Sequence, residues 1–263
     1  MTQNPSPFRR LHERTLVLPN AWDGASAALF AAAGAPAIAT TSAGVAWSLG
    51  YQDSQGAPID EMIAALARIV AVSPVPVTAD IEAGYGDAAA TVARIIALGV
   101  SGINLEDSEG GALVDPATMR ERIIAVREVA AGAGADLFVN ARIDTYLFGV
   151  ENALDATLER GAAYVDAGAD GIFVPGLADL EAMRVLSGAI TVPLNVMVAA
   201  GSPPVADLED AGVRRISTGM ALAHQAWAVA AASAVDILTE GHFDAIDPGV
   251  EYGRLNGLLR TGG

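Results

Sequence analysis

Residues 77–87 read Val77-Thr78-Ala79-Asp80-Ile81-Glu82-Ala83-Gly84-Tyr85-Gly86-Asp87. A short apolar run, typical of a buried strand, ends in two carboxylates one residue apart and continues into a glycine-rich turn. A second apolar run, at 102–105, ends in the same way in Glu106 and Asp107. Parallel barrel strands present their carboxyl ends at one mouth, so we expect these acids to meet there as hard oxygen ligands for a Mg²⁺-type ion.

Short β-rich runs alternate with longer helical segments along the whole chain. The predicted strands are 15–19, 37–42, 76–80, 102–106, 137–142, 171–175, 192–197 and 215–218. Segments with helical spacing lie between them, among them 60–72, 87–98, 116–131 and 152–167. This alternation favours an α/β fold of the (β/α)₈ TIM-barrel type over an open doubly wound sheet, and no Gly-x-Gly-x-x-Gly motif follows the first strand. We expect one domain over residues 1–263, with an appended helical segment at 241–263.

The composition excludes several classes of chemistry. The chain carries a formal net charge of −16, which disfavours nucleic acid and anionic membranes as partners. All fifteen basic residues are Arg, and Lys and Cys are both absent. Schiff-base aldolases, lysine-bound pyridoxal phosphate, P-loops and thiolate nucleophiles are therefore excluded. Three His residues leave acid–base work mainly to carboxylates, Tyr, hydroxyls and water.

Residues 220–238 form the longest apolar stretch, which is rich in Ala and interrupted by His224, Gln225, Ser233 and Asp236. These polar interruptions favour a fully buried helix over a membrane span. The N-terminus lacks a basic segment followed by an apolar one, so a cytoplasmic location is expected.

Several motifs follow the predicted strands, at the positions where barrel chemistry is found. They are Asn-Ala-Trp-Asp at 20–23, Thr-Ser-Ala-Gly-Val at 41–45, Asp53, Asp-Ile-Glu-Ala-Gly-Tyr-Gly at 80–86, Asn-Leu-Glu-Asp at 104–107 and Asn-Ala-Arg-Ile-Asp-Thr-Tyr at 140–146. In this combination the chain resembles the isocitrate lyase/phosphoenolpyruvate mutase superfamily over essentially its whole length.

The resemblance implies a Mg²⁺ site, with Mn²⁺ as an alternative ion. The metal ligands it implies are Asp80, Glu82 (where many relatives carry Asp) and Glu106. It implies catalytic roles for Arg142, as stabiliser of enolate charge, and for Asp53, a loop acid near the metal. The substrate contacts expected with it are Trp22, Thr41, Ser42, Ala43, Tyr85, Arg142 and Asn195.

The chain departs from the family pattern in the loop after Glu106. The well-known lyases carry a Lys-Lys/Arg-Cys-Gly-His gating sequence there, and the phosphonomutases carry Lys and Asn. Residues 108–115 of this chain read Ser-Glu-Gly-Gly-Ala-Leu-Val-Asp. The residues implied for metal and enolate are present, whereas those that select the reaction are replaced.

The resulting hypothesis is a Mg²⁺-dependent carbon–carbon lyase. It would act on a small 2-oxo or 2-hydroxy di- or tricarboxylic acid, by decarboxylation or retro-aldol cleavage, through a metal-stabilised enolate. The alternatives are a phosphonate P–C mutase or hydrolase of the same superfamily, and a non-catalytic barrel that binds a 2-oxo acid. The apolar stretch and the family resemblance together predict a homodimer or homotetramer formed by exchange of the C-terminal helix.

Overall fold

The computed structural model describes residues 6–244, 246 and 249–259. In this part of the chain nine strands form one parallel sheet: β1 (Leu16–Leu18), β2 (Asn20–Ala21), β3 (Ile38–Thr40), β4 (Val77–Asp80), β5 (Gly102–Glu106), β8 (Phe138–Arg142), β9 (Gly171–Val174), β10 (Leu194–Met197) and β11 (Val213–Ser217). A separate antiparallel hairpin consists of β6 (Ser108–Glu109) and β7 (Ala112–Leu113).

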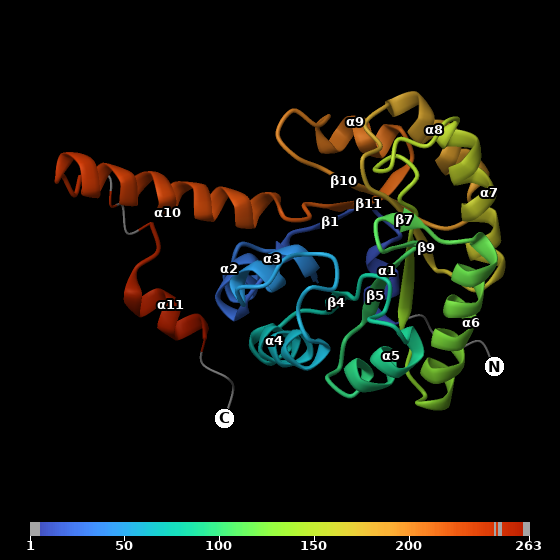
Figure 1. The fold of residues 1–263 in the computed structure, drawn as a ribbon, viewed down its shortest axis with the longest axis horizontal. Helices are drawn as coiled ribbons and strands as arrows, with labels where there is room; N and C mark the ends of the chain where they lie inside the picture. Colours follow the sequence, from blue (N-terminus) through green and yellow to red (C-terminus); the bar gives the residue numbers. More distant parts are fainter. Residues whose placement is uncertain (1–5, 245, 247–248, 260–263) are drawn as a thin grey trace.

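Helices connect the strands and surround the sheet (Figure 1). They are α1 (Pro7–Leu11), α2 (Gly24–Ala32), α3 (Ser42–Ser48), α4 (Ile59–Val72), α5 (Ala88–Ile96), α6 (Pro116–Gly132), α7 (Ala153–Asp166), α8 (Leu180–Ala189), α9 (Val205–Asp210), α10 (Ala221–Glu240) and α11 (Tyr252–Leu258). Short polar side chains cap several helix N-termini: the carboxylates of Asp23, Asp87, Asp115 and Asp179 accept backbone N–H groups of α2, α5, α6 and α8.

The sheet closes into a barrel through its first strand. β1 pairs with β11 at one end of the strand order, and β2 pairs with β3 at the other. β1 and β2 follow each other in the chain on either side of Pro19, so together they occupy one strand position of the barrel. Pro19 lacks an N–H group, which explains why the predicted strand 15–19 divides at this residue. The predicted TIM-barrel fold is confirmed.

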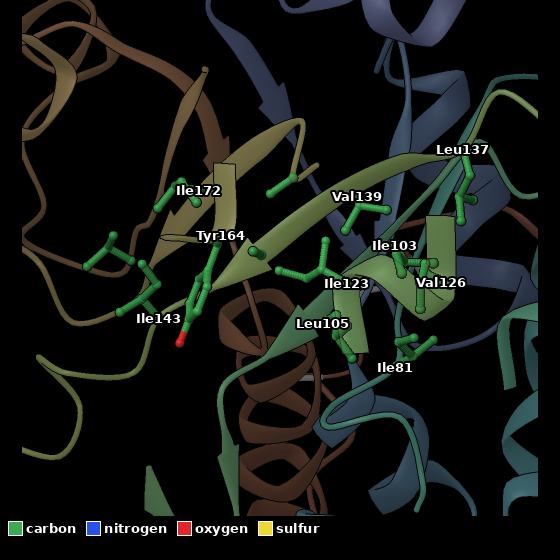
Figure 2. Packing of buried hydrophobic residues seen from close by; sticks show 14 of the residues in the cluster. Ile81, Ile103, Leu105, Ile123, Val126, Leu137, Val139, Ile143, Tyr164 and Ile172 are labelled. Carbon is green, nitrogen blue, oxygen red and sulfur yellow. The ribbon is translucent and has the colours of Figure 1, made fainter. Parts of the chain in front are cut away.

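The main core lies between the barrel wall and the outer helices. Figure 2 shows Ile103, Leu105 and Val139 on the strands packed with Ile123 and Val126 of α6. A second core lies inside the barrel, where α1 contributes Phe8. Its members are Phe8, Leu16, Leu18, Ala37, Ala39 and Phe138. This inner core fills the end of the barrel that is opposite the strand carboxyl ends, which leaves the other end for polar side chains.

The prediction that residues 220–238 form a fully buried helix is wrong for the single chain. They lie in α10, which extends away from the barrel (Figure 1) and has Ala223 as its only buried residue. Val229 is 62% exposed and Leu238 is 84% exposed. Among the described residues the barrel packs only the first turns of α10, so the rest of this apolar helix lacks cover from that part of the chain.

The expected C-terminal helical segment is present in part. α11 packs against α2, and within the predicted segment 241–263 residues 245, 247–248 and 260–263 lie outside the described residues.

Candidate functional site

A cavity of about 360 Å³ opens at the carboxyl ends of β4, β5 and β8. Its lining residues are Ser42, Asp53, Ser54, Gln55, Glu82, Glu106, Ser108, Glu109, Gly110, Gly111, Arg142, Asp144, Leu147 and Phe148. This volume lies within the range of small-molecule sites, and the carboxyl ends of the strands are where barrel sites are found.

Asp80, at the end of β4, is held by the neighbouring strand and helix. The backbone N–H and the hydroxyl of Ser42 donate to its Oδ2 at 3.2 and 2.9 Å. The backbone N–H of Asp80 donates to Thr40 Oγ1 at 2.9 Å. These bonds fix the carboxylate beside Ser42, which lines the cavity.

Glu82 and Tyr85 form a pair in the turn after Asp80. Tyr85 Oη donates to Glu82 Oε1 at 2.6 Å, and the backbone N–H of Gln55 donates to Glu82 Oε2. Both Glu82 and Tyr85 have positive φ angles, of 51° and 53°. Such angles cost non-glycine residues free energy and cluster at functional sites, where surrounding contacts hold them in place.

Arg142, at the end of β8, bridges two acids. Its Nη1 lies 2.8 Å from Glu106 Oε2, and its Nε donates to Asp144 Oδ1 at 2.6 Å. Ser108, at the start of the hairpin, donates to Asp144 as well. Glu106 and Arg142 are register partners on adjacent strands, so the sheet itself brings this pair together.

Burial and mutual repulsion make these carboxyl groups weak acids. Burial, with the charges of Asp80 and Asp53, raises the pKa of Glu82 to about 7 against the opposing hydrogen bond from Tyr85. Burial raises the pKa of Glu106 to about 8, although Arg142 opposes this. The pKa of Asp53 is raised by burial and by Asp80. The carboxyl groups of this cluster outnumber the single charge of Arg142, so charging all of them leaves a surplus of negative charge without a further cation.

This surplus charge and the oxygen ligands fit a hard divalent cation. Among the described residues, no three His, Asp or Glu side chains converge closely enough to hold an ion by themselves. Mg²⁺ commonly keeps several water ligands and binds through one or two carboxylates. The residues therefore fit an ion that keeps several water ligands, rather than a closed carboxylate cage.

Asp107 differs from its neighbour Glu106, because it faces away from the cavity. It accepts from Arg160 Nη1 and Tyr164 Oη, both at 2.8 Å, and from the backbone N–H of Asp144 at 3.0 Å. Asp107 is completely buried. It therefore braces the β5 and β8 loops on which Glu106 and Arg142 depend.

The structure brings together seven of the predicted site residues, and four lie elsewhere. The seven are Ser42, Asp53, Asp80, Glu82, Tyr85, Glu106 and Arg142. Thr41 caps α3, and Ala43 is buried within that helix. Asn195 is fully buried and exchanges hydrogen bonds with Ser217 inside the barrel. Trp22 packs against Phe30 and Trp227 beside α10.

Several residues that line the cavity are absent from the sequence-based site prediction. Asp144 carries a usable signal, because it is an acid two residues beyond the end of β8. Ser108, Leu147 and Phe148 carry no such signal. Their positions depend on how the hairpin and the loop after β8 fold over the mouth.

The fold and the site define a TIM-barrel protein with an acidic, arginine-containing mouth. Residues 8–238 match the phosphoenolpyruvate phosphomutase family. The chain therefore belongs to the phosphoenolpyruvate mutase/isocitrate lyase superfamily, in agreement with the resemblance of its motifs.

Three relatives show the range of this similarity. The uncharacterized protein Rv1998c of Mycobacterium tuberculosis (strain ATCC 25618 / H37Rv) is 38% identical over 96% of this chain and 95% of its own length. The 2-methylisocitrate lyase of Escherichia coli (strain K12) is 34% identical over 62% of this chain and 58% of its own. A solved structure of a putative phosphonomutase from Burkholderia cenocepacia J2315 is 45% identical with a TM-score of 0.83, over 86% of this chain and 96% of that one. The relatives thus include both a lyase and a putative phosphonomutase.

Proposed function

We propose that this protein is a Mg²⁺-dependent carbon–carbon lyase that acts on a small 2-oxo or 2-hydroxy di- or tricarboxylic acid, with Mn²⁺ as an alternative ion. The observation that carries the proposal is the charge of the cavity. Asp53, Asp80, Glu82, Glu106 and Asp144 lie in or beside it with one arginine, Arg142. A divalent cation relieves this repulsion and gives an anionic substrate a positive centre to bind.

When bound, the metal would supply electron withdrawal from the 2-oxo or 2-hydroxy group of the substrate. Asp80 is the direct ligand in this proposal, because Ser42 and the end of β4 orient its carboxylate toward the mouth. Glu82 and Glu106 hold the metal less directly, and Tyr85 keeps the Glu82 carboxylate in place.

In this proposal Arg142 and Asp53 act on the substrate itself. The guanidinium of Arg142 stabilises the negative charge that develops on the enolate oxygen when the C–C bond breaks. Asp53, whose pKa is raised by burial, exchanges a proton with the substrate hydroxyl or with the product carbon. Decarboxylation needs the least further help, because CO₂ leaves without a proton donor.

Pyruvate formation from oxaloacetate tests the proposal. We expect pyruvate to form faster with the wild type and Mg²⁺ than with Mg²⁺ alone. In Asp80→Ala the enzyme-dependent rate should fall at least about 100-fold. Asp60→Ala is the matched control, since Asp60 forms an exposed ion pair with Arg94. Tight binding of the 2-oxo acid with no turnover above the metal-only rate would contradict lyase activity and indicate a binding barrel.

Phosphonate chemistry is the second candidate, and the 45% identical putative phosphonomutase favours it. The loop at 108–115 argues against it, because it contains neither Lys nor Asn. Phosphonopyruvate is the discriminating substrate. Its conversion by the wild type, with oxaloacetate left unchanged, would replace the lyase proposal by a P–C bond reaction.

The assembly we propose is a homodimer or homotetramer in which α10 is exchanged between copies. Two exposed apolar surfaces support it. α10 is long and apolar enough, by length and composition, to pass for a membrane span, yet it is mostly exposed. Val17, on the outer face of β1, is 38% exposed. A second copy of α10 laid over the uncovered part of the barrel would bury both surfaces.

A further inference from the structure

Arg215 of β11 is a buried arginine inside the barrel that the proposed reaction does not use. Its side chain is fully buried, and its Nη2 donates to Asn104 Oδ1 at 3.0 Å. Its Nε and Nη1 have no hydrogen-bond partner among the described residues. Nor does any acidic side chain of the described chain lie within ion-pair distance of it. Arg215 is thus a buried cation without a direct counter-ion.

The position of Arg215 is directly below the acid cluster. Asn104, which accepts from Arg215, also accepts from Asn140 Nδ2 at 2.9 Å. Asn104 is the register partner of Asp80 and lies two residues before Glu106 on β5. Two residues along a strand span about 7 Å. The guanidinium therefore lies about one layer of side chains beneath Glu106, close to the strand level of Asp80.

Arg215 remains charged at neutral pH. Burial lowers its pKa to about 9, and the charge of Asp80 partly opposes this. A buried charge with unsatisfied donors costs a protein stability, and such costs are typical of residues kept for function. Since Arg142 is already bound to two acids, Arg215 is the second positive charge that acts on this mouth.

We propose that Arg215 is a positioning residue: an internal cation that weakens the hold of the acid cluster on its metal and favours binding of an anionic substrate above it. The inference rests on the proposed metal site. The charge of Arg215 acts on the metal cation and on the substrate anion through the low-dielectric interior of the barrel. Repulsion acts on the metal, and attraction acts on the substrate anion.

The test compares Arg215→Met with the wild type by calorimetric titration of Mn²⁺, and then of oxalate at saturating Mn²⁺. We expect Arg215→Met to bind Mn²⁺ about tenfold more tightly and oxalate about tenfold more weakly. Arg214→Met is the matched control, because Arg214 is its chain neighbour and donates to backbone oxygens of Glu209 and Val213.

Structural damage cannot imitate this result, because it would weaken both probes together. Equal or weaker Mn²⁺ binding by folded Arg215→Met overturns the inference and leaves the proposed function intact. An unchanged oxalate affinity overturns it as well. If Arg215→Met does not fold, Arg215→Gln carries the same test with a neutral polar side chain. Absence of Mn²⁺ binding by the wild type overturns the proposed metal site, and this inference with it.

Discussion

Glu106 and Asp107 are adjacent in the chain and have opposite surroundings. Glu106 lies in the cavity against Arg142, whereas Asp107 is buried behind it against Arg160 and Tyr164. Successive side chains of a strand point to opposite faces, so one acid of the pair faces the barrel mouth and the other faces the helices. An acid pair at a strand end thus contains one candidate ligand and one structural anchor.

The structural role of Asp107 leads to a prediction. Arg160→Met removes the cation beside Asp107, whose carboxylate is completely buried. We expect a loss of about 3–5 kcal/mol in the free energy of unfolding, because breaking one side of a buried pair leaves an uncompensated charge. Urea unfolding measures this loss. Metal binding per folded molecule should stay unchanged.

The control for this prediction is Arg94→Met. Arg94 pairs with Asp60 at the surface, where the two side chains are 45% and 83% exposed. Exposed pairs of this kind contribute less than about 1 kcal/mol. Equal losses for the two variants would contradict the anchoring role of Asp107.

At the scale of elements, α1 closes the barrel at the end opposite the site. His12 follows this helix and is buried, with its ring stacked on Phe138 at a centroid distance of 4.2 Å and its Nδ1 3.1 Å from the carbonyl oxygen of Phe8. Burial, together with the charge of Arg215, lowers the pKa of His12 to about 4. The histidine in this closed end of the barrel is therefore neutral near pH 7.

This neutral histidine predicts a pH dependence of stability. The unfolded chain binds a proton on His12 below about pH 6.5, whereas the folded chain does so only below about pH 4, so stability falls as the pH falls through this interval. Its contribution reaches about 3 kcal/mol. Urea unfolding at pH 7 and at pH 4.5 should show a smaller acid loss for His12→Phe than for the wild type. His242→Phe, at an exposed position, is the control. Identical acid losses for His12→Phe and the wild type would contradict the prediction.

At the scale of the whole molecule, the proposed exchange makes α10 the element that sets the state of association. A twenty-residue apolar helix that projects from its own barrel exposes a large apolar surface, and such surfaces mark interaction sites. Light scattering at micromolar concentration should give a dimer or tetramer mass. The double variant Val229→Glu/Val235→Glu should dissociate it, because both side chains are at least 60% exposed in the single chain and would be buried by the exchange.

Val185→Glu is the matched control, since Val185 is 41% exposed and lies on α8 rather than on the exchanged helix. A monomeric mass for the wild type would contradict the exchange. So would an unchanged mass for the double variant.

The strand-end acids and the helix spacing were readable from the chain because both are local. The strand at 102–106 has the predicted bounds, and the helix predicted at 116–131 ends one residue later, at Gly132. The contacts of Trp22 and Asn195 were not readable, because they depend on which strands and helices become neighbours. Nor was the exposure of α10, because composition does not say whether a barrel, a partner or water lies beside a helix.

The alternating β/α order, the barrel and the acids at the strand ends are therefore predictable from the chain alone. These follow from periodicity and from the rule that parallel strands share one mouth. The folded molecule was needed to show that Glu106 faces Arg142 while Asp107 faces Arg160, that Arg215 is buried next to the acid cluster, and that α10 leaves the barrel. Each of these depends on contacts between residues far apart in the chain, and local pattern does not encode such contacts.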